Sequence, residues 1–501
     1  MELRQGLKIY KKERRNSMRV LENLEPKKVF HYFEEICSIP HPSYKEKRIS
    51  DYLVNFAKEH GLKYYQDDLY NVIMIAPATE GYENEEPIIL QGHMDMVCEK
   101  EPGVEIDFEN DGLTLMVDGD YVTAKGTTLG GDDGIAIAYA LAILDSPEVA
   151  HPRLEVIITV SEEVGMEGAT GIDLSMLQGH KLLNLDSEEE GVMTVSCAGG
   201  NSSICHIPMS YERAEGVQLV LTVKGLRGGH SGAEIDKGRA NSNLVMGRLL
   251  LALDQADLCC PIAKLSGGAK QNAIPRETGA VIVVAPDKRE AVLACLRETI
   301  AQIKSEYATP DPDIVLDITE QGSGAVQVLT EECMKKAWVL INNLPGGIQS
   351  MSADIAGLVE TSLNMGIVSL EEKELRIEFA VRSSVVSARD ALTARIRNLV
   401  EYAGGSLEVN GVYPAWEYKK DSVLREDAVR IFEQMYGKAP QVEAIHAGLE
   451  CGILAGKIKD LDAISIGPDM IGIHTFEEKL SISSTKRVYE YVLEVLKCRH
   501  A

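Results

Sequence analysis

Four short apolar segments of the chain each end in side chains that can bind a metal ion or move a proton. Imidazole and carboxylate groups together are ligands for zinc, manganese or cobalt, and such ions activate water for hydrolysis. The sequence therefore predicts a hydrolytic metal site. The four endings are His93-Met94-Asp95 after residues 87–92, Ser161-Glu162-Glu163 after residues 154–160, Asp186 after residues 181–185, and His474, which residues 463–466 reach through Gly467-Pro468-Asp469.

The paired residues in this set suggest a division of roles. Asp95 stands two residues after His93, so at a strand end both project to one side and the carboxylate can hold the free imidazole nitrogen. Glu162 and Glu163 follow a segment expected to be buried. One can bind metal while the other acts as general base on a water molecule. Each pair alone also fits a structural role, as a buried histidine with a polar neighbour or as two solvated acids.

A fifth candidate is the segment Leu129-Gly130-Gly131-Asp132-Asp133-Gly134, which opens an apolar helix over residues 135–144. Acidic side chains are favourable beside a helix N-terminus, so both aspartates could simply cap this helix. Either could equally supply a metal ligand. The coincidence of five acidic or imidazole sites at predicted strand ends or turns favours the metal.

The elements that must position these residues form an α/β fold. Apolar runs of this length are typical of buried strands, and their composition favours parallel pairing. In open α/β sheets, ligands bind in the crevice beyond the carboxyl ends of the strands. The sequence therefore predicts one crevice that collects all of these side chains.

Strands and helices alternate to about residue 200, as in a doubly wound sheet, and the pattern then becomes mixed α+β until about Trp416. We predict an extension at 1–17, a catalytic domain formed by 18–201 and 417–501, and a domain inserted at 202–416. Helices are predicted at 25–60 with a break at Pro40 and Pro42, and at 240–256, 288–308, 330–344, 425–436 and 484–498. Ser483 or Ser484 is the predicted cap of the last helix.

Composition excludes several classes of function. The 501-residue chain carries a formal net charge of −26, which disfavours nucleic acid and anionic membranes as partners. No apolar run approaches the roughly 20 residues that cross a bilayer. Ten scattered cysteines without a Cys-x-x-Cys pair, and no secretory signal, predict reduced thiols in a cytoplasmic protein. Cys98 lies close to His93, but no oriented pair supports it as a nucleophile.

Seven motifs together resemble the M20 metallopeptidases, in the family's order, from about Leu21 onward. This resemblance implies an α/β catalytic domain of the zinc-peptidase type that holds two metals, with an inserted α+β lid domain. The motifs are QGHMD, LGGDDG, SEEVGMEGA, LNLDSEEEG, RGGHSG, KQNAIPRE and IHTFEEKL.

The resemblance also assigns roles to residues of the metal site. Asp132 is preferred over Asp133 as the bridging acid because the bridging position lies two residues before the final glycine of its motif. Two divalent metal ions are implied, zinc first, with manganese or cobalt as alternatives. One metal is assigned to His93 and Asp186, the second to Glu163 and His474, the bridge to Asp132, the orientation of His93 to Asp95 and the general base to Glu162.

Further residues are expected to contact the substrate. His230, in Gly-Gly-His-Ser-Gly, matches a lid histidine that reaches the substrate carbonyl, although alone it would fit an ordinary turn. Asn272 and Arg276 match lid positions near the substrate. Arg382 ends a predicted strand and is a candidate for binding a carboxylate, against the alternative of a surface ion pair. Glu450 is a candidate for recognition of a substrate amino group.

The predicted function is hydrolysis of dipeptides, including aminoacyl-histidine, by a metal-activated water with a glutamate general base. The partner is then a small peptide, and the resemblance implies a homodimer through the lid. The alternatives are another M20 amide hydrolase, such as a deacylase or carboxypeptidase, and a metal-binding protein without catalysis. An intact general base beside an intact ligand set argues against the last alternative.

Overall fold

The computed structural model describes residues 19–499, in two compact units. The first unit comprises the described residues through Val195, then Lys419–Glu443, then the chain from Ile453 onward. The second unit comprises Ser196–Tyr418 and Ala444–Gly452. The segment 444–452 differs from our expectation, which put it in the last part of the catalytic domain. The predicted extension at 1–17 lies outside the described residues.

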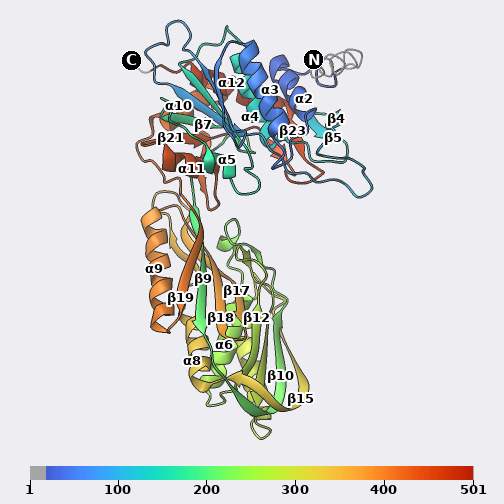
Figure 1. The fold of residues 1–501 in the computed structure, drawn as a ribbon, viewed down its shortest axis with the longest axis vertical. Helices are drawn as coiled ribbons and strands as arrows, with labels where there is room; N and C mark the ends of the chain where they lie inside the picture. Colours follow the sequence, from blue (N-terminus) through green and yellow to red (C-terminus); the bar gives the residue numbers. More distant parts are fainter. Residues whose placement is uncertain (1–18, 500–501) are drawn as a thin grey trace. The chain divides into compact units, whose positions relative to one another are not determined.

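The first unit is built on an eight-stranded sheet whose central strands are parallel (Figure 1). β3 pairs in parallel with both β6 and β7, and β7 with β21, as the apolar runs predicted. β2 runs antiparallel to β6. The order of the sheet is β1 (Lys63–Gln66), β2 (Val72–Ala76), β6 (Leu154–Thr159), β3 (Ile88–His93), β7 (Lys181–Asn184), β21 (Asp462–Ser465), β8 (Val192–Cys197) and β20 (Gln441–Ile445).

Helices and a smaller sheet complete the first unit. α4 packs on α2 and β3 and is buried along nearly its whole length, which explains its almost entirely apolar sequence. The smaller sheet, in the order β22-β23-β5-β4, joins the segment before α4 to the end of the chain. The elements are α2 (Lys27–Cys37), α3 (Lys47–Glu59), β4 (Leu115–Asp118), β5 (Tyr121–Ala124), α4 (Gly131–Leu144), α5 (Glu167–Gly171), α10 (Val423–Tyr436), β22 (Met470–Ile471), β23 (Lys479–Ser481) and α12 (Ile482–Leu496). The helix α11 (Glu450–Lys457) is divided between the units, and its part from Ile453 onward belongs to the first.

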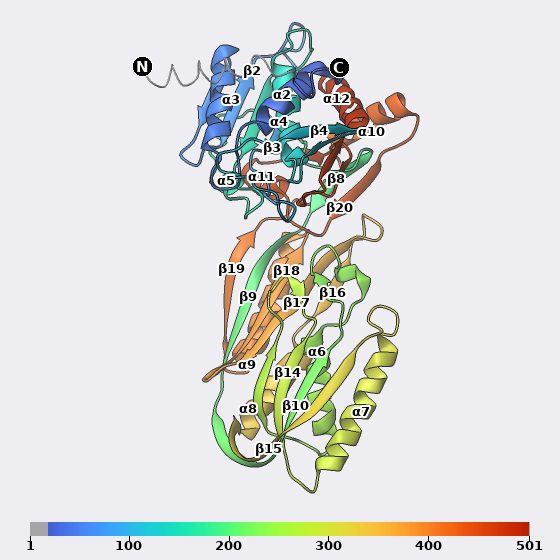
Figure 2. The same cartoon turned by 90° about the vertical axis from the view of Figure 1, so that its right-hand side faces the viewer.

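The second unit is an antiparallel sheet with helices, and its long strands are evident in Figure 2. Its main order is β15-β10-β14-β12-β17-β18-β9-β19, with β16 also paired to β17. The strands are β9 (Gly199–Pro208), β10 (Tyr211–Lys224), β12 (Ile262–Gly267), β14 (Thr278–Val284), β15 (Val315–Leu329), β16 (Gly347–Met351), β17 (Val359–Leu370), β18 (Glu374–Ser383) and β19 (Ser406–Tyr413). The helices are α6 (Ser242–Gln255), α7 (Arg289–Glu306), α8 (Glu331–Asn343) and α9 (Val386–Tyr402), and a short pair joins β11 (Gly229–His230) to β13 (Ala273–Ile274).

The predicted helices are present with small shifts at their ends, but the predicted cap of the last helix is wrong. α12 begins at Ile482, and Ser481 is its cap, with a side chain that accepts the backbone N–H of Ser484. Ser481 still belongs to β23, so the strand passes directly into the helix. A serine that ends a strand and caps the next helix is hard to distinguish from its serine neighbours in sequence.

Candidate metal centre

The carboxyl edge of the parallel strands carries the predicted ligands. β3 ends at His93, and Asp95 follows it after one residue. β6 ends at Thr159, and a turn through Ser161, which has a φ of 54°, leads to the paired glutamates. Asp186 comes two residues after β7. Because parallel strands end at one edge of a sheet, these residues of distant sequence meet there.

Asp132 lies between the two predicted histidine ligands. One of its carboxylate oxygens is 3.0 Å from Nε2 of His93, and the other is 3.1 Å from Nε2 of His474. Asp186 is 3.6 Å from the same nitrogen of His93, and Glu163 is 2.9 Å from the same nitrogen of His474. The groups His93, Asp132, Asp186 and Asp132, Glu163, His474 therefore each bring three ligand atoms within 4.8 Å of one another. Such a donor set fits two divalent ions that share one carboxylate.

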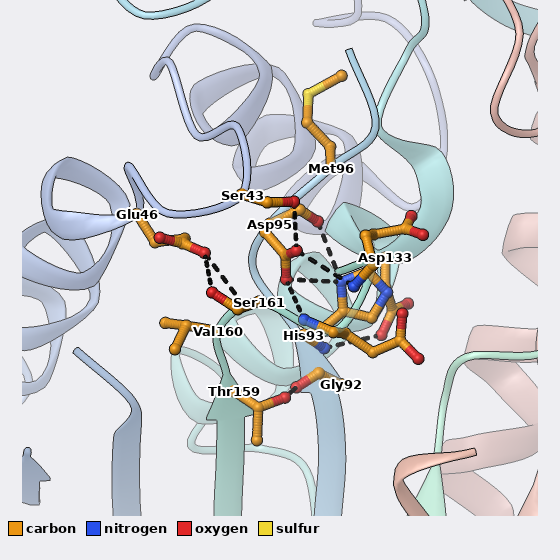
Figure 3. A network of polar contacts seen from close by, with 12 residues as sticks. Ser43, Glu46, Gly92, His93, Asp95, Met96, Asp133, Thr159, Val160 and Ser161 are labelled. Atoms are coloured by element: carbon orange, nitrogen blue, oxygen red, sulfur yellow. Dashed lines mark hydrogen bonds and ion pairs between the residues drawn. The ribbon is translucent and has the colours of Figure 1, made fainter. Parts of the chain in front are cut away.

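Asp133 has a different environment from its neighbour. Its side chain is fully buried behind β3, where one oxygen accepts the backbone N–H of His93 at 3.1 Å (Figure 3). Burial raises the pKa of this carboxyl well above its ordinary value. A Cβ atom at Gly92 would lie 2.4 Å from the Asp133 carboxylate, so glycine at this position of β3 makes room for it. The geometry thus separates the two aspartates, which the local repeat in the sequence could not.

The electrostatics of the cluster show how strongly it attracts positive charge. Hydrogen bonds to Asp132 and Glu163 raise the pKa of His474 to about 10. Burial alone would raise the pKa of Asp132, but its bonds to the two histidines outweigh burial and hold that pKa below the ordinary value. Burial raises the pKa of Asp186 to about 6, against the opposing charge of His93. Protons balance the carboxylates here, and metal ions can take their place.

Asp95 contacts more than the histidine it was predicted to orient. The nearer partner of His93 Nδ1 is the backbone carbonyl of Asp95 at 3.0 Å, while the carboxylate lies 3.4 Å away. The carboxylate accepts the backbone N–H groups of Glu162 at 2.9 Å and Glu163 at 3.3 Å, and the hydroxyl of Ser43 at 2.8 Å. Asp95 therefore contacts both the candidate ligand His93 and the backbone of the paired glutamates.

Two buried glutamates near the centre were not identified in the sequence. Glu46 accepts both the backbone N–H and the hydroxyl of Ser161, each at 3.0 Å (Figure 3). Glu478 accepts backbone N–H groups of the segment that carries Asp132. Glu46 lies in a polar stretch with a helical pattern, where a buried glutamate cannot be distinguished from exposed ones. Glu478 lies within the IHTFEEKL motif, four residues after His474, but the motif alone assigned it no role.

In the second unit, Arg382 and His230 lie together. Nη2 of Arg382 is 3.5 Å from Nε2 of His230, and Nη1 donates to the hydroxyl of Tyr413 at 2.9 Å. Arg382 and Tyr413 both pair with Gly200 of the strand between them, β9. A Cβ at Gly200 would lie 2.5 Å from the Tyr413 hydroxyl, so its absence lets the two side chains meet.

The protonation of His230 follows from its contacts. Its Nδ1 accepts the backbone N–H groups of Gly232 at 3.3 Å and Ala233 at 3.1 Å, so the neutral ring carries its proton on Nε2. Burial and the charge of Arg382 lower its pKa, which favours that neutral ring. Two donors, Nε2–H and the guanidinium, thus face each other. This arrangement suits an acceptor oxygen between them.

The remaining substrate candidates have diverse surroundings in the second unit. Asn272 is exposed, and its backbone carbonyl accepts the N–H of Ser231 at 2.9 Å. Arg276 is also exposed, and its Nε donates to the carbonyl of Leu226 at 3.1 Å. Glu450 is fully buried at the start of α11. His446, which the sequence analysis missed, is buried and bonds Ser362 at 2.7 Å.

The fold and the cluster together define a two-unit α/β protein with a candidate site for divalent metal ions. Residues 89–497 match the family described as Peptidase family M20/M25/M40, and the chain belongs to this family. The match confirms the resemblance inferred from the motifs and the predicted fold class.

Several relatives are similar over nearly the whole chain. The cytosol non-specific dipeptidase of Escherichia coli (strain K12) is 38% identical over 485 residues, which cover 96% of this chain and 99% of that protein. The crystal structure of aminoacylhistidine dipeptidase from Vibrio alginolyticus has a TM-score of 0.91 at 34% identity, over 97% of this chain and 99% of that chain. The aminopeptidase PepT of Bacillus cereus, at 16% identity and a TM-score of 0.54 over 94% of this chain and 98% of that chain, shares the fold.

Proposed function

We propose that this chain is a metal-dependent dipeptidase with a broad substrate range that includes aminoacyl-histidine. The observation that carries the proposal is the position of Asp132, with one oxygen facing His93 and the other facing His474. A relative named as a non-specific dipeptidase and one named as an aminoacylhistidine dipeptidase, each matched over almost its full length, support the substrate class.

We infer that zinc is the resident metal, with manganese or cobalt as substitutes, because imidazole and carboxylate ligands suit all three. His93 and Asp186 would hold one ion, Glu163 and His474 the other, and Asp132 both. When bound, the ions supply Lewis acidity that polarises the scissile carbonyl and makes water a better nucleophile.

The residues of the chain would then move the protons. Glu162 takes a proton from the attacking water and passes it to the nitrogen of the leaving amine. Asp95 holds Glu162 through its backbone N–H, which keeps the base in place during that transfer. The Nε2–H of His230 is suited to donate to the oxygen on which negative charge develops.

Length selection would come from Arg382. Its guanidinium is always charged and matches a carboxylate with two parallel hydrogen bonds. Its Nε has no hydrogen-bond partner among residues 19–499 although it is buried, so it retains a donor for the free carboxylate of a dipeptide. Asn272, Arg276 and Glu450 are further candidates for contact with the substrate.

The proposed cellular location and oligomeric state of the protein rest on its similarity to the same relatives. No helix within residues 19–499 is long and apolar enough to cross a membrane. We propose the cytoplasm, on the similarity to a relative named as a cytosol dipeptidase. We also propose a homodimer formed through the second unit, on the family resemblance alone.

A direct test is hydrolysis of aminoacyl-histidine and other dipeptides by metal-free protein, before and after addition of zinc, manganese or cobalt. Activity should be absent without metal and return with it. Undiminished activity in verified metal-free protein would refute the mechanism. Cleavage of N-acyl amino acids in preference to dipeptides would indicate a deacylase of the same family.

A further inference from the structure

Glu478 is a buried carboxylate that organises the segment which carries Asp132. Its side chain, with a residue exposure of 2%, accepts backbone N–H groups from consecutive residues. Oε2 accepts those of Leu129 at 2.6 Å and Gly130 at 3.1 Å, and Oε1 accepts that of Gly131 at 2.8 Å. The N–H of Asp132 itself lies 3.5 Å from Oε1.

The segment needs such a partner because it cannot cap itself. α4 begins at Gly131, and the residue before it, Gly130, has no side chain to accept the first free N–H groups. Asp132 and Asp133 have non-helical backbone angles, so the first turn departs from regular helical geometry. A carboxylate from a distant part of the chain therefore replaces the usual N-cap, and its charge also suits the helix N-terminus.

The position of Glu478 ties this segment to the second histidine ligand. Glu478 stands four residues after His474, and its own backbone N–H donates to the carbonyl of Thr475 at 3.2 Å. Its backbone carbonyl accepts the hydroxyl of Thr123 in β5 at 2.9 Å, and β23 follows immediately. The turn that presents His474 and the loop that presents Asp132 are thus joined through one side chain.

We propose that Glu478 is a positioning residue of the metal centre, which sets the distance between Asp132 and His474 and so maintains affinity for metal. A carboxylate that must face both histidines with separate oxygens tolerates little movement of its backbone. Loss of the partners that orient metal ligands typically costs about 10–100-fold in metal affinity or activity. This inference rests on the proposed metal-dependent function.

Glu478→Gln is a sharp test because it preserves size. Both oxygens of Glu478 accept backbone N–H groups, so either orientation of a carboxamide turns its NH₂ group toward N–H donors. The control is Glu155→Gln. Glu155 is fully buried near the start of β6 and accepts the backbone N–H groups of Gln178, at 3.0 Å, and Gly179, also at 3.0 Å. It therefore makes the same kind of bond at the opposite end of the strand from the metal ligands.

Zinc binding to the two full-length variants and to the wild type is measured by calorimetry and by competition with a chelator. Wild type and Glu155→Gln should bind two ions with equal affinity, and Glu478→Gln should bind at least one of them about 10–100-fold more weakly. At saturating zinc, the kcat of Glu478→Gln should return to the wild-type value while its KM stays unchanged. General misfolding of the variant would not be reversed by zinc in this way. If Glu478→Gln does not fold, Gly131→Ala serves instead, because a Cβ there would press on Glu478 Oε1 at 3.2 Å.

Wild-type zinc affinity in Glu478→Gln, or in Gly131→Ala where that variant replaces it, would overturn the positioning role and leave the dipeptidase proposal standing. Equal weakening in Glu155→Gln and Glu478→Gln would also overturn it, since general destabilisation would then explain both. Wild-type protein that binds no zinc would overturn the proposed function together with this inference.

Discussion

The carboxylate of Asp95 accepts the backbone N–H of Glu162 at 2.9 Å, so the residue that neighbours the first histidine ligand also fixes the candidate general base. A side chain buried to 1% exposure in this position has little freedom to move. The candidate metal site and the candidate general base therefore depend on the same side chain.

Asp95→Asn should lower kcat by about 10–100-fold, because a carboxamide cannot accept hydrogen bonds with both of its ends and the glutamate backbone loosens. Steady-state kinetics at saturating metal measure this loss. Ser43→Ala is the matched control, since it removes one donor to Asp95 and leaves the bond to Glu162. An equal loss in both variants would argue against the role of the Glu162 contact.

Glu162→Gln should retain both metals and lose about 10²–10⁴-fold in kcat, because general-base catalysis typically contributes that much. Glu163→Gln should instead weaken metal binding, since Glu163 lies 2.9 Å from Nε2 of His474. Metal content and kcat are measured on both variants. The reverse pattern would show that the roles of the two glutamates are exchanged.

Metal binding should release protons near neutral pH. The pKa of His474 is raised to about 10 in the metal-free chain, so its imidazole is protonated at pH 7, whereas a metal requires the neutral ring. Affinity at this site should therefore rise with pH, by up to about tenfold per unit while one proton is released. Calorimetry in buffers of different ionisation enthalpy measures the protons released. If the measured heat of metal binding were the same in all buffers, no proton would be released and the expectation would be contradicted.

Arg382→Ala should lower kcat/KM by as much as amidation of the substrate's C-terminus does. The two losses in kcat/KM should not add when both changes are combined. A hydrogen bond to a charged group contributes roughly 1.5–3 kcal/mol, or about one to two decades in kcat/KM. The measurement is a double cycle of wild type and Arg382→Ala with free-acid and amide dipeptides. Arg248→Ala, which removes an exposed ion pair with Glu306 in the same unit, is the control. Fully additive losses for Arg382 would assign carboxylate binding to another residue, with Arg276 the next candidate.

The sequence predicted the parts of the site that depend on local order. Short apolar runs that stop at His93 or Asp186 indicated parallel strands, and parallel strands bring their ends together. The choice between Asp132 and Asp133 needed the structure, because only packing against Gly92 shows which carboxylate is buried behind the sheet. The position of Asp132 two residues before the final glycine of its motif had also favoured Asp132, but it gave no physical reason for the preference.

Contacts between distant segments were beyond prediction from sequence. The Glu478 carboxylate reaches the backbone N–H of Gly130, 348 residues earlier, and backbone N–H groups leave no trace in side-chain patterns. The segment that contains His446 and Glu450 was assigned to the catalytic domain because the surrounding sequence is α/β in style. Its membership of the second unit follows from long-range packing, which no local periodicity reports.

The position of Asp132 between His93 and His474 has a consequence for biosynthesis. Asp132 and His474 are separated by 342 residues, so a ribosome that adds about 5–20 residues per second needs roughly 20 to 70 seconds to make the second after the first. For most of that interval the nascent chain carries the acidic candidates and His93 but still lacks His474. The group that pairs Glu163 with His474 can therefore form only after translation of the His474 segment, whereas His93, Asp132 and Asp186 of the other group are made earlier.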